Sequence, residues 1–298
     1  MEKVIIFGGC GFIGKNLTKY LKKFYDVIVI DKYIDDIFLK ENKIEFYQYD
    51  FENIDQLKKI IDEEKPNYII NLISYVTSVR ELSLFPKMIN SNLDILLKIY
   101  ETTKDLENLK LVMQFGSGEE YGNIESPFTE IMKEEPVSPY AIAKLLTTNT
   151  ALMLYKNYNY PICIVRPSNL FGKYQAKDKF IPYILEKLKN NEKILTTFGE
   201  QKRDFISIDD FVNIIQKLLE KSSLIRGEVI NVGSGISISL KDIILYLKEK
   251  LNSTSEIKFG AIPYRENEMM NFCLDISKLE SILDKKLKMK WLEKIIEE

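Results

Sequence analysis

The sequence contains no histidine, and this absence removes several classes of catalytic and binding site at once. A Ser-His-Asp triad, a Cys-His pair and a histidine-ligated zinc site all need the imidazole that these 298 residues lack. We therefore predict no metal site. Any proton transfer should use a tyrosine, a lysine, a cysteine or a carboxylate instead.

Cysteines and long apolar runs are also scarce, and the net charge is small. Cys10, Cys163 and Cys273 are odd in number and widely spaced, which favours reduced thiols in a cytoplasmic protein over a disulfide framework. The apolar runs are strand-sized, and the first begins so near the N-terminus that we expect neither a membrane span nor a signal peptide. A net charge of −2 offers no basic surface for nucleic acid. We expect neither a membrane nor a nucleic acid as a partner.

The most informative pattern that is present lies at the N-terminus. An apolar run, Val4–Phe7, leads directly into Gly8-Gly9-Cys10-Gly11-Phe12-Ile13-Gly14, which fits both G-x-G-x-x-G and G-x-x-G-x-x-G. A helical stretch, Lys15–Phe24, follows, and a second apolar run, Val27–Ile30, ends at Asp31. Strand, glycine turn, helix, strand and acid in this order predict a dinucleotide-binding β-α-β unit. The alternative is a glycine-rich turn in an ordinary α/β protein.

Each part of this unit has a physical role toward a dinucleotide. Glycines let the backbone approach a pyrophosphate, and the helix N-terminus offers free N–H groups to it. Asp31 would accept hydrogen bonds from the ribose hydroxyls and repel a 2′-phosphate, so the predicted cofactor is NAD rather than NADP. The predicted contacts of the turn are Gly8, Gly11, Phe12, Ile13 and Gly14.

The first half of the chain alternates strand-like and helix-like segments. The predicted strands are Val4–Phe7, Val27–Ile30, Ile44–Tyr47, Tyr68–Leu72, Leu111–Phe115 and Ile162–Arg166, and the predicted helices are Lys15–Phe24, Ile54–Glu64, Lys87–Thr103 and Pro139–Asn157. This alternation predicts an α/β fold of the Rossmann type, a doubly wound parallel sheet. After Pro167 the regularity weakens into a smaller C-terminal α/β lobe, with helices predicted at Lys179–Asn190, Asp209–Glu220 and Leu240–Lys250.

A catalytic set is predicted where the fifth strand ends. Ser117 follows the strand Leu111–Phe115, and Ser138-Pro139 opens a helix with a capping residue and a proline at its first position. Tyr140 and Lys144 are four residues apart and so share a helical face. An ammonium beside a phenol lowers the pKa of the phenol, which can then exchange a proton with a substrate hydroxyl or ketone. On its own, a tyrosine and a lysine at this spacing are more often exposed surface residues without a catalytic role.

These motifs together resemble an extended short-chain dehydrogenase/reductase, of the NAD-dependent epimerase/dehydratase branch that acts on nucleotide sugars. The resemblance covers nearly the whole chain. The matching stretches are the glycine turn with Asp31, Asp50-Phe51, Asn71 to Ser74, Pro86 with Asn90, Ser117 to Gly122, Tyr140 with Lys144, Arg166 to Gly172, Arg203 to Asp210, Asn231 to Gly235, and Arg265 with Glu268.

The resemblance implies a role for each matching residue. Ser117, Tyr140 and Lys144 would be catalytic, and Lys144 would also hold the nicotinamide ribose. Asp50 and Phe51 would lie by the adenine, and Ser74 against the cofactor. The implied substrate residues are Glu119, Asn169, Arg203, Arg265 and Glu268, with Asn169 on the diphosphate, both arginines on phosphates and Glu268 on the nucleotide ribose. The alternative for Arg203 is a local surface ion pair with Asp204.

The resemblance also implies a domain division and a reaction. Residues 1–168 would bind NAD, with elements around 204–232 returning to that domain, and residues 169–298 would form the nucleotide-sugar lobe. Related 4,6-dehydratases usually carry Asp-Glu after the catalytic Ser or Thr, whereas Gly118 precedes Glu119 here, and many relatives carry Ser where Gly116 stands. The stretches Glu119 to Gly122 and Phe259 to Glu268 resemble those of reductases that act on 4-keto sugar nucleotides. We therefore expect hydride transfer at C4 of a nucleotide-diphosphate sugar, as a 4-dehydrogenase or 4-ketoreductase. The alternatives are a 4-epimerase with retained NAD, a 4,6-dehydratase and a non-catalytic redox sensor.

A further expectation concerns assembly. The predicted helices Lys87–Thr103 and Pro139–Asn157 are apolar on more than one face. One face of each must cover the sheet, and the surplus would pair with its own copy in a homodimer. The alternative is that the smaller lobe or local packing covers the surplus.

Overall fold

The computed structural model describes residues 1–33, 35–77 and 81–297, which divide into two compact units. The first comprises residues 1–120, 136–166 and 212–230, and the second residues 121–135, 167–211 and 231–298. The chain therefore passes between the units several times.

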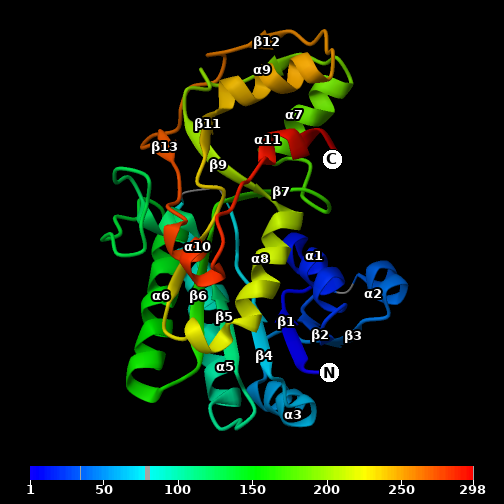
Figure 1. Ribbon diagram of the computed structural model, residues 1–298, viewed down its shortest axis with the longest axis vertical. Helices are drawn as coiled ribbons and strands as arrows, with labels where there is room; N and C mark the ends of the chain where they lie inside the picture. Colours follow the sequence, from blue (N-terminus) through cyan, green and yellow to red (C-terminus); the bar gives the residue numbers. More distant parts are fainter. Residues whose placement is uncertain (34, 78–80, 298) are drawn as a thin grey trace. The chain divides into compact units, whose positions relative to one another are not determined.

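The first unit is built on a sheet with the strand order β10-β6-β5-β4-β1-β2-β3 (Figure 1). Its neighbours from β3 to β6 pair in parallel, which is the doubly wound α/β arrangement predicted from the alternation. The strands are β1 (Lys3–Phe7), β2 (Asp26–Asp31), β3 (Glu45–Gln48), β4 (Tyr68–Asn71), β5 (Leu111–Phe115), β6 (Ile162–Pro167) and β10 (Val229–Val232).

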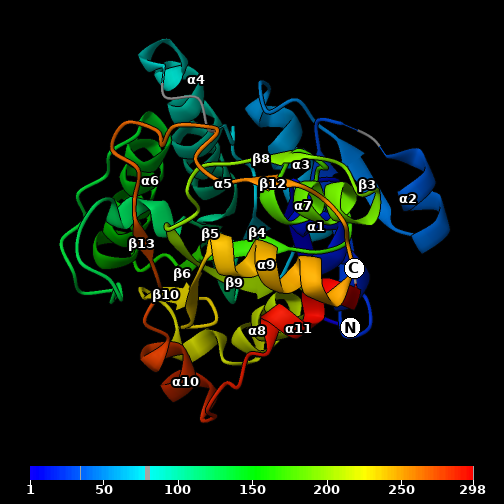
Figure 2. The same cartoon turned by 90° about the horizontal axis from the view of Figure 1, so that it is seen from above.

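Helices cover this sheet. Its central strands are buried on both sides, as the Val4–Phe7 run shows with no exposed side chain, whereas the edge strand β3 is partly exposed. The helix α1 packs on β1 and β2, and Asn213 of α8 donates a 2.8 Å hydrogen bond to the Tyr20 hydroxyl of α1. Helices α3 and α5 pack together, as do α4 and α6 (Figures 1 and 2). The helices are α1 (Phe12–Leu21), α2 (Asp36–Asn42), α3 (Ile54–Glu64), α4 (Phe85–Ile89), α5 (Ile95–Thr103), α6 (Pro139–Tyr158) and α8 (Ile208–Glu220).

All six predicted strands are present, but two helical details differ from the prediction. The short helix α2 was not predicted; Asp35 caps it by accepting from the backbone N–H of Phe38 at 3.0 Å. The single helix predicted over Lys87–Thr103 is α4 and α5 joined by a π-helical turn, Asn90–Asp94. The buried side chain of Asn92 donates to the Met88 carbonyl at 2.7 Å within this turn.

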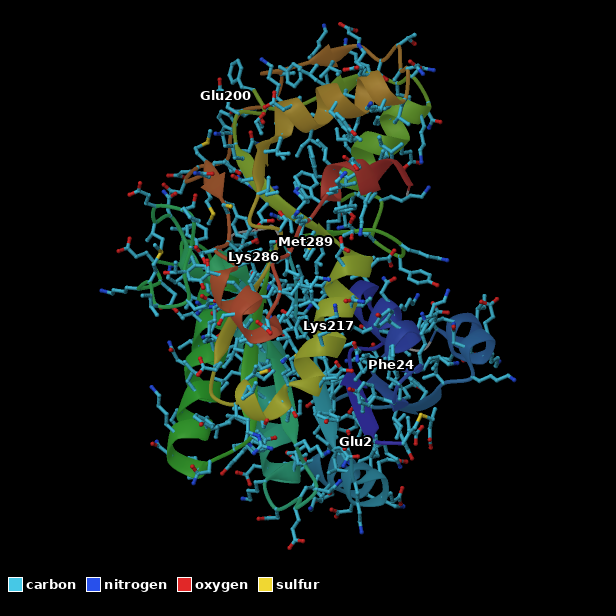
Figure 3. The ribbon with its side chains drawn as sticks, in the orientation of Figure 1. Glu2, Phe24, Glu200, Lys217, Lys286 and Met289 are labelled. Carbon is cyan, nitrogen blue, oxygen red and sulfur yellow. The ribbon has the colours of Figure 1, made fainter. Side chains whose placement is uncertain are left out.

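The edge of the sheet near the N-terminus is held by side-chain contacts. Glu2, labelled in Figure 3, accepts hydrogen bonds from Lys110 and, at 3.1 Å, from the Tyr68 hydroxyl. These contacts tie the start of β1 to β4 and to the residue before β5. These contacts lie at the amino ends of the strands. The functional residues lie at the opposite, carboxyl ends.

The second unit has its own sheet and its own core. Strand β9 pairs in parallel with β7 and β13 and antiparallel with β11, and β8 pairs with β12. The core gathers around Trp291, whose ring contacts those of Phe171 and Phe205. Its elements are β7 (Asn169–Phe171), α7 (Phe180–Lys189), β8 (Ile194–Leu195), β9 (Lys202–Ser207), β11 (Ser237–Ser239), α9 (Leu240–Lys250), β12 (Ile257–Lys258), β13 (Asn271–Phe272), α10 (Ser277–Leu283) and α11 (Trp291–Lys294).

Candidate functional site

The glycine turn between β1 and α1 has the close packing that a dinucleotide cradle requires. Gly8 has φ +79°, a left-handed conformation that favours glycine. A Cβ on Gly14 would meet the Gly8 carbonyl oxygen and lie 2.6 Å from the Gly9 Cα, so only glycine lets α1 start this close to the turn. Gly11 caps α1 without any side-chain hydrogen bond to its first amides, which suits an anion at that end. The turn therefore fits the pyrophosphate of NAD.

Asp31 lies at the end of β2 and is tied to this turn. Its carboxylate accepts from the Cys10 backbone N–H at 2.9 Å and from the Tyr33 backbone N–H at 3.2 Å. The acid predicted to bind ribose therefore also fixes the glycine turn, a second role that the sequence pattern did not reveal. Its half-buried position beside the turn fits a ribose diol.

The remaining predicted cofactor residues differ in exposure. Asp50 is exposed, whereas the Phe51 ring is buried against Phe7 and Tyr49 and its backbone has φ +68°. Phe51 can therefore offer the adenine its backbone rather than the face of its ring. The Ser74 hydroxyl is buried without a hydrogen bond of ordinary geometry in the described part of the chain, although its proximity to Tyr140 lowers the pKa of that phenol. A polar group of a bound ligand would give this buried hydroxyl the hydrogen bond that it lacks.

The catalytic set predicted from the sequence meets at the carboxyl end of β5. Ser138 caps α6 by accepting from the Ala141 backbone N–H at 3.1 Å, as predicted. Lys144 is buried, and its ammonium donates to the Phe115 carbonyl at 2.8 Å and lies 5.9 Å from the centre of the Tyr140 ring. The Ser117 hydroxyl lies within hydrogen-bonding reach of Tyr140. The three side chains thus lie near one another.

Burial controls the electrostatics of this set. It raises the pKa of the Tyr140 phenol, with a further rise from the charge of Glu119, while the hydrogen bond with Ser117 lowers it. The lowering of this pKa that we expected from Lys144 is therefore not found: burial of the phenol raises the pKa instead. Burial also lowers the pKa of Lys144, to about 8, against an opposing effect of Glu120. Tyr140 is accordingly a protonated phenol at neutral pH and Lys144 an ammonium.

A buried ion pair beside this set was not predicted. Glu120 and Arg166 both have fully buried side chains, and the guanidinium donates to one carboxylate oxygen from Nε at 2.9 Å and from Nη2 at 2.7 Å. The other carboxylate oxygen accepts from the Ser117 backbone N–H at 2.7 Å. Glu119, the neighbour predicted to bind substrate, is exposed. In the sequence, the one sign of this pair was Gly116, where many relatives carry serine. A side chain at that position would collide with the Glu120 carboxylate.

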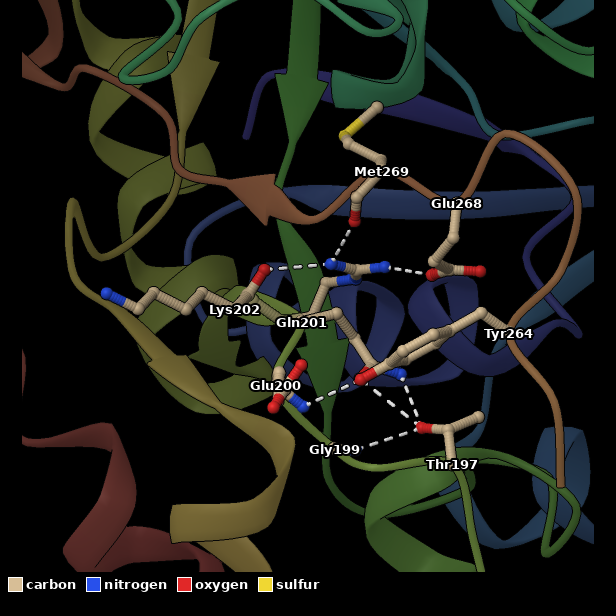
Figure 4. Close-up of polar contacts among 9 residues, drawn as sticks. Thr197, Gly199, Glu200, Gln201, Lys202, Tyr264, Glu268 and Met269 are labelled. Carbon is tan, nitrogen blue, oxygen red and sulfur yellow. Dashed lines mark hydrogen bonds and ion pairs between the residues drawn. The ribbon is translucent and has the colours of Figure 1, made fainter. Parts of the chain in front are cut away.

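The predicted substrate residues other than Glu119 lie in the second unit. Figure 4 shows the Arg203 guanidinium donating to the carbonyls of Lys202 at 2.8 Å and Met269 at 2.6 Å, and to the Glu268 carboxylate. Arg203 therefore pairs with Glu268, whereas the buried Asp204 carboxylate accepts from the Ser234 backbone N–H at 2.9 Å and from the Ser234 hydroxyl.

The other two predicted substrate residues of this unit are Asn169 in β7 and Arg265 in the loop before β13. The Asn169 side chain donates to the Asp204 carbonyl at 2.9 Å. Arg265 is exposed, and its carbonyl accepts from the Glu268 backbone N–H at 3.2 Å in the turn before β13. Arg203, Arg265 and Glu268 are thus brought together, and all three have side chains at least partly open to solvent.

Comparison with known families decides what kind of protein this geometry belongs to. A family model described as the NAD dependent epimerase/dehydratase family matches residues 4–233. The chain belongs to this family. It is therefore a member of a family of NAD-dependent enzymes, and the glycine turn, Asp31, Ser117, Tyr140 and Lys144 all lie within the matched residues. No helix in residues 1–33, 35–77 and 81–297 is long and apolar enough to cross a membrane.

Individual relatives of this family member differ in activity. A dTDP-D-glucose 4,6-dehydratase of Dictyostelium discoideum is 29% identical over 266 residues, which cover 82% of this chain but only 61% of that protein. A dTDP-4-dehydro-6-deoxyglucose reductase of Escherichia coli is 29% identical over 86% of this chain and 84% of its own. The structure of a UDP-glucose 4-epimerase of Thermotoga maritima superposes with a TM-score of 0.89 at 23% identity, covering 98% of this chain and 96% of that one. This last likeness concerns the fold.

Proposed function

We propose that this enzyme transfers a hydride at C4 of a nucleotide-diphosphate sugar, as a 4-ketoreductase or, in reverse, a 4-dehydrogenase. The observation that carries the proposal is the meeting of Ser117, Tyr140 and Lys144 at the carboxyl end of β5, in the unit that holds the glycine turn. The first unit would bind NAD, and the second the nucleotide part of the substrate.

The protonation states support the reductive direction. Bound NAD(H) would supply or accept the hydride at C4. As the hydride arrives at the ketone carbon, the Tyr140 hydroxyl gives its proton to the ketone oxygen, and a secondary alcohol forms. Ser117 donates a hydrogen bond to the same oxygen, and the Lys144 ammonium stabilises the phenolate that remains. The raised pKa of Tyr140 keeps its proton available for this step.

Dehydration is disfavoured by the residue after Ser117. Gly118 has no carboxyl group, so this position cannot protonate a leaving hydroxyl as an aspartate would. The Escherichia coli reductase supports a 4-keto sugar nucleotide as the substrate class, because its alignment covers most of both chains. As its name states, that relative is a reductase of dTDP-4-dehydro-6-deoxyglucose.

Substrate binding is proposed for the second unit. Arg203 and Arg265 would bind the diphosphate, because a planar guanidinium pairs with phosphate oxygens bidentately. Asn169 would contact the diphosphate, and Glu268 the ribose. In the ligand-free structure Glu268 holds the Arg203 guanidinium, so it would also orient that side chain before the phosphate arrives.

The test is turnover with a panel of nucleotide-linked sugars. The purified enzyme is mixed with NADH and the 4-keto-6-deoxy sugars of dTDP, GDP, CDP and UDP, and NADH oxidation is followed by absorbance. We expect the wild type to oxidise NADH with at least one 4-ketone. With Tyr140→Phe we expect no NADH oxidation above background. Epimerisation of a nucleotide hexose without net NADH oxidation, with NAD recovered from the denatured protein, would replace this proposal by a 4-epimerase. Release of water from a nucleotide hexose would replace it by a dehydratase.

A further inference from the structure

The Glu120–Arg166 pair has features that a surface ion pair lacks. Both side chains have no exposed surface, and two N–H groups of Arg166 share one carboxylate oxygen of Glu120. Isolated charges are strongly disfavoured in such a position, so each residue depends on the other. The pair joins β6 to the turn that follows β5.

The second carboxylate oxygen of Glu120 reaches the catalytic turn itself. It accepts the Ser117 backbone N–H at 2.7 Å, in the turn that also gives the Glu120 backbone N–H to the Ser117 carbonyl at 3.1 Å. A Cβ on Gly116 would collide with this oxygen and would approach the Ile164 and Arg166 side chains to 3.2 and 3.3 Å. Glutamate at position 120, in this conformation, therefore requires glycine at position 116.

Lys144 binds the same stretch of backbone from α6. Its ammonium is held by the Phe115 carbonyl, two residues before the amide that Glu120 holds. Ammonium and carboxylate thus flank residues 115–117, with the Arg166 guanidinium beyond the carboxylate. Within the described residues, the charged and titratable groups around this stretch are Glu119, Glu120, Tyr140, Lys144 and Arg166.

We infer that Glu120, anchored by Arg166, is a positioning residue that fixes the Ser117 turn and supplies the buried negative charge facing Lys144. The inference rests on the proposed function only in taking Ser117, Tyr140 and Lys144 as the catalytic set. Glu120 itself touches neither substrate nor cofactor in this account. It acts through the Ser117 amide and through the charge on Lys144.

The first test measures the titration of Lys144 without any substrate. The Lys144 side chain is followed by NMR of ¹³C,¹⁵N-lysine-labelled protein and assigned with Lys144→Arg. Glu120→Gln keeps an acceptor for the Ser117 N–H and removes the charge, so the pKa of Lys144 should fall by about one unit from its value of about 8. Glu107→Gln, a change at an exposed glutamate of the same unit, should leave this pKa where it is. An unchanged titration in Glu120→Gln would refute the electrostatic part of the inference.

The pH dependence of turnover provides the matching kinetic readout. Lys144 is charged below its pKa, so activity should fall as the pH rises through about 8 in the wild type and at lower pH in Glu120→Gln. A residue that only supports the fold would lower turnover equally at every pH. If the wild type turns over no substrate of the panel, the proposed function fails, yet the NMR titration still decides the inference.

A second variant guards against misfolding of Glu120→Gln. Replacing a buried ion pair by apolar side chains of similar size often preserves stability, so Glu120→Leu with Arg166→Met is the choice. We expect a cooperative thermal transition and retained NAD binding, with the Lys144 titration moved to lower pH and turnover at pH 7 lowered at least about tenfold. Wild-type turnover and an unmoved Lys144 titration in this folded double variant would overturn the inference entirely.

Discussion

Each of the two units contains an Arg–Glu pair, and the two pairs differ in their access to water. Arg166 and Glu120 are fully buried in the first unit, whereas Arg203 and Glu268 of the second unit keep 16% and 17% of their side chains exposed. A fully buried pair cannot exchange partners with a ligand, and so it fixes geometry. A partly exposed pair can release its arginine to a phosphate at a small cost in free energy, because water screens the separated charges. We therefore expect changes at the buried pair to alter the rate of turnover, and changes at the partly exposed pair to alter substrate affinity.

The largest expected effect lies at the reacting oxygen. Tyr140→Phe keeps the ring and removes the proton donor, so turnover should fall by roughly 10²–10⁴ while NAD affinity and thermal stability stay at wild-type values. Turnover and NAD binding are measured side by side, with Tyr158→Phe, an exposed tyrosine of the same helix, as the matched control. Near-normal turnover in Tyr140→Phe would show that the Tyr140 hydroxyl is not the proton donor.

The second prediction concerns the partly exposed pair. Arg203→Lys keeps a positive charge and loses the planar fork, so KM for the nucleotide sugar should rise about tenfold or more while kcat changes little. The control is Arg226→Lys, the same exchange at an exposed arginine of the first unit. A fall in kcat with an unchanged KM would reverse the assignment of roles drawn from the two pairs.

Local rules predicted much of this site, because the relevant residues lie close together in sequence. The glycine turn, the Ser138 cap and the shared face of Tyr140 and Lys144 all follow from spacings of a few residues. The buried pair joins residues 46 positions apart, and the exposed pair joins residues 65 positions apart. Such pairings depend on how strands and turns meet in three dimensions.

The helices and strands likewise divide into those that local sequence predicts and those that depend on contacts in three dimensions. The strands were predictable because their apolar runs are buried on both faces of the sheet. The π-helical turn between α4 and α5 was not, since it depends on the Asn92 side chain turning back to the Met88 carbonyl. The raised pKa of Tyr140 was also beyond sequence, because burial sets it.

A smaller effect is expected at the cofactor end of the first unit. Asp31→Ser should weaken NAD binding about tenfold and improve NADP binding, because the substitution removes both the ribose acceptor and the repulsion of a 2′-phosphate. Asp31→Asn is the informative companion, since it keeps an acceptor for the Cys10 N–H and removes only the charge. Both affinities are measured by titration. Equal affinities for NAD and NADP in the wild type would show that Asp31 does not select the cofactor.

The smallest expected effect concerns assembly. Ile142, Leu146 and Met153 of α6 and Leu97 of α5 keep 38–41% of their surface exposed. We predict that these apolar positions pair with a second copy, giving a mass of twice 34.8 kDa in sedimentation equilibrium. Leu146→Lys should shift the protein toward monomer, and Leu224→Lys, at an exposed leucine outside these helices, should not. A wild-type monomer at micromolar concentration would argue against the dimer.

The most direct test of the catalytic account is to follow the hydride itself. The enzyme is given NADH deuterated at the transferable position of the nicotinamide, together with the nucleotide 4-ketone that it turns over, and the product is examined by fragmentation mass spectrometry. The proposed roles of Ser117, Tyr140 and Lys144 predict one deuterium, located at C4, and no labelled product from Tyr140→Phe. Deuterium at C6, or an alcohol product without deuterium at C4, would contradict them.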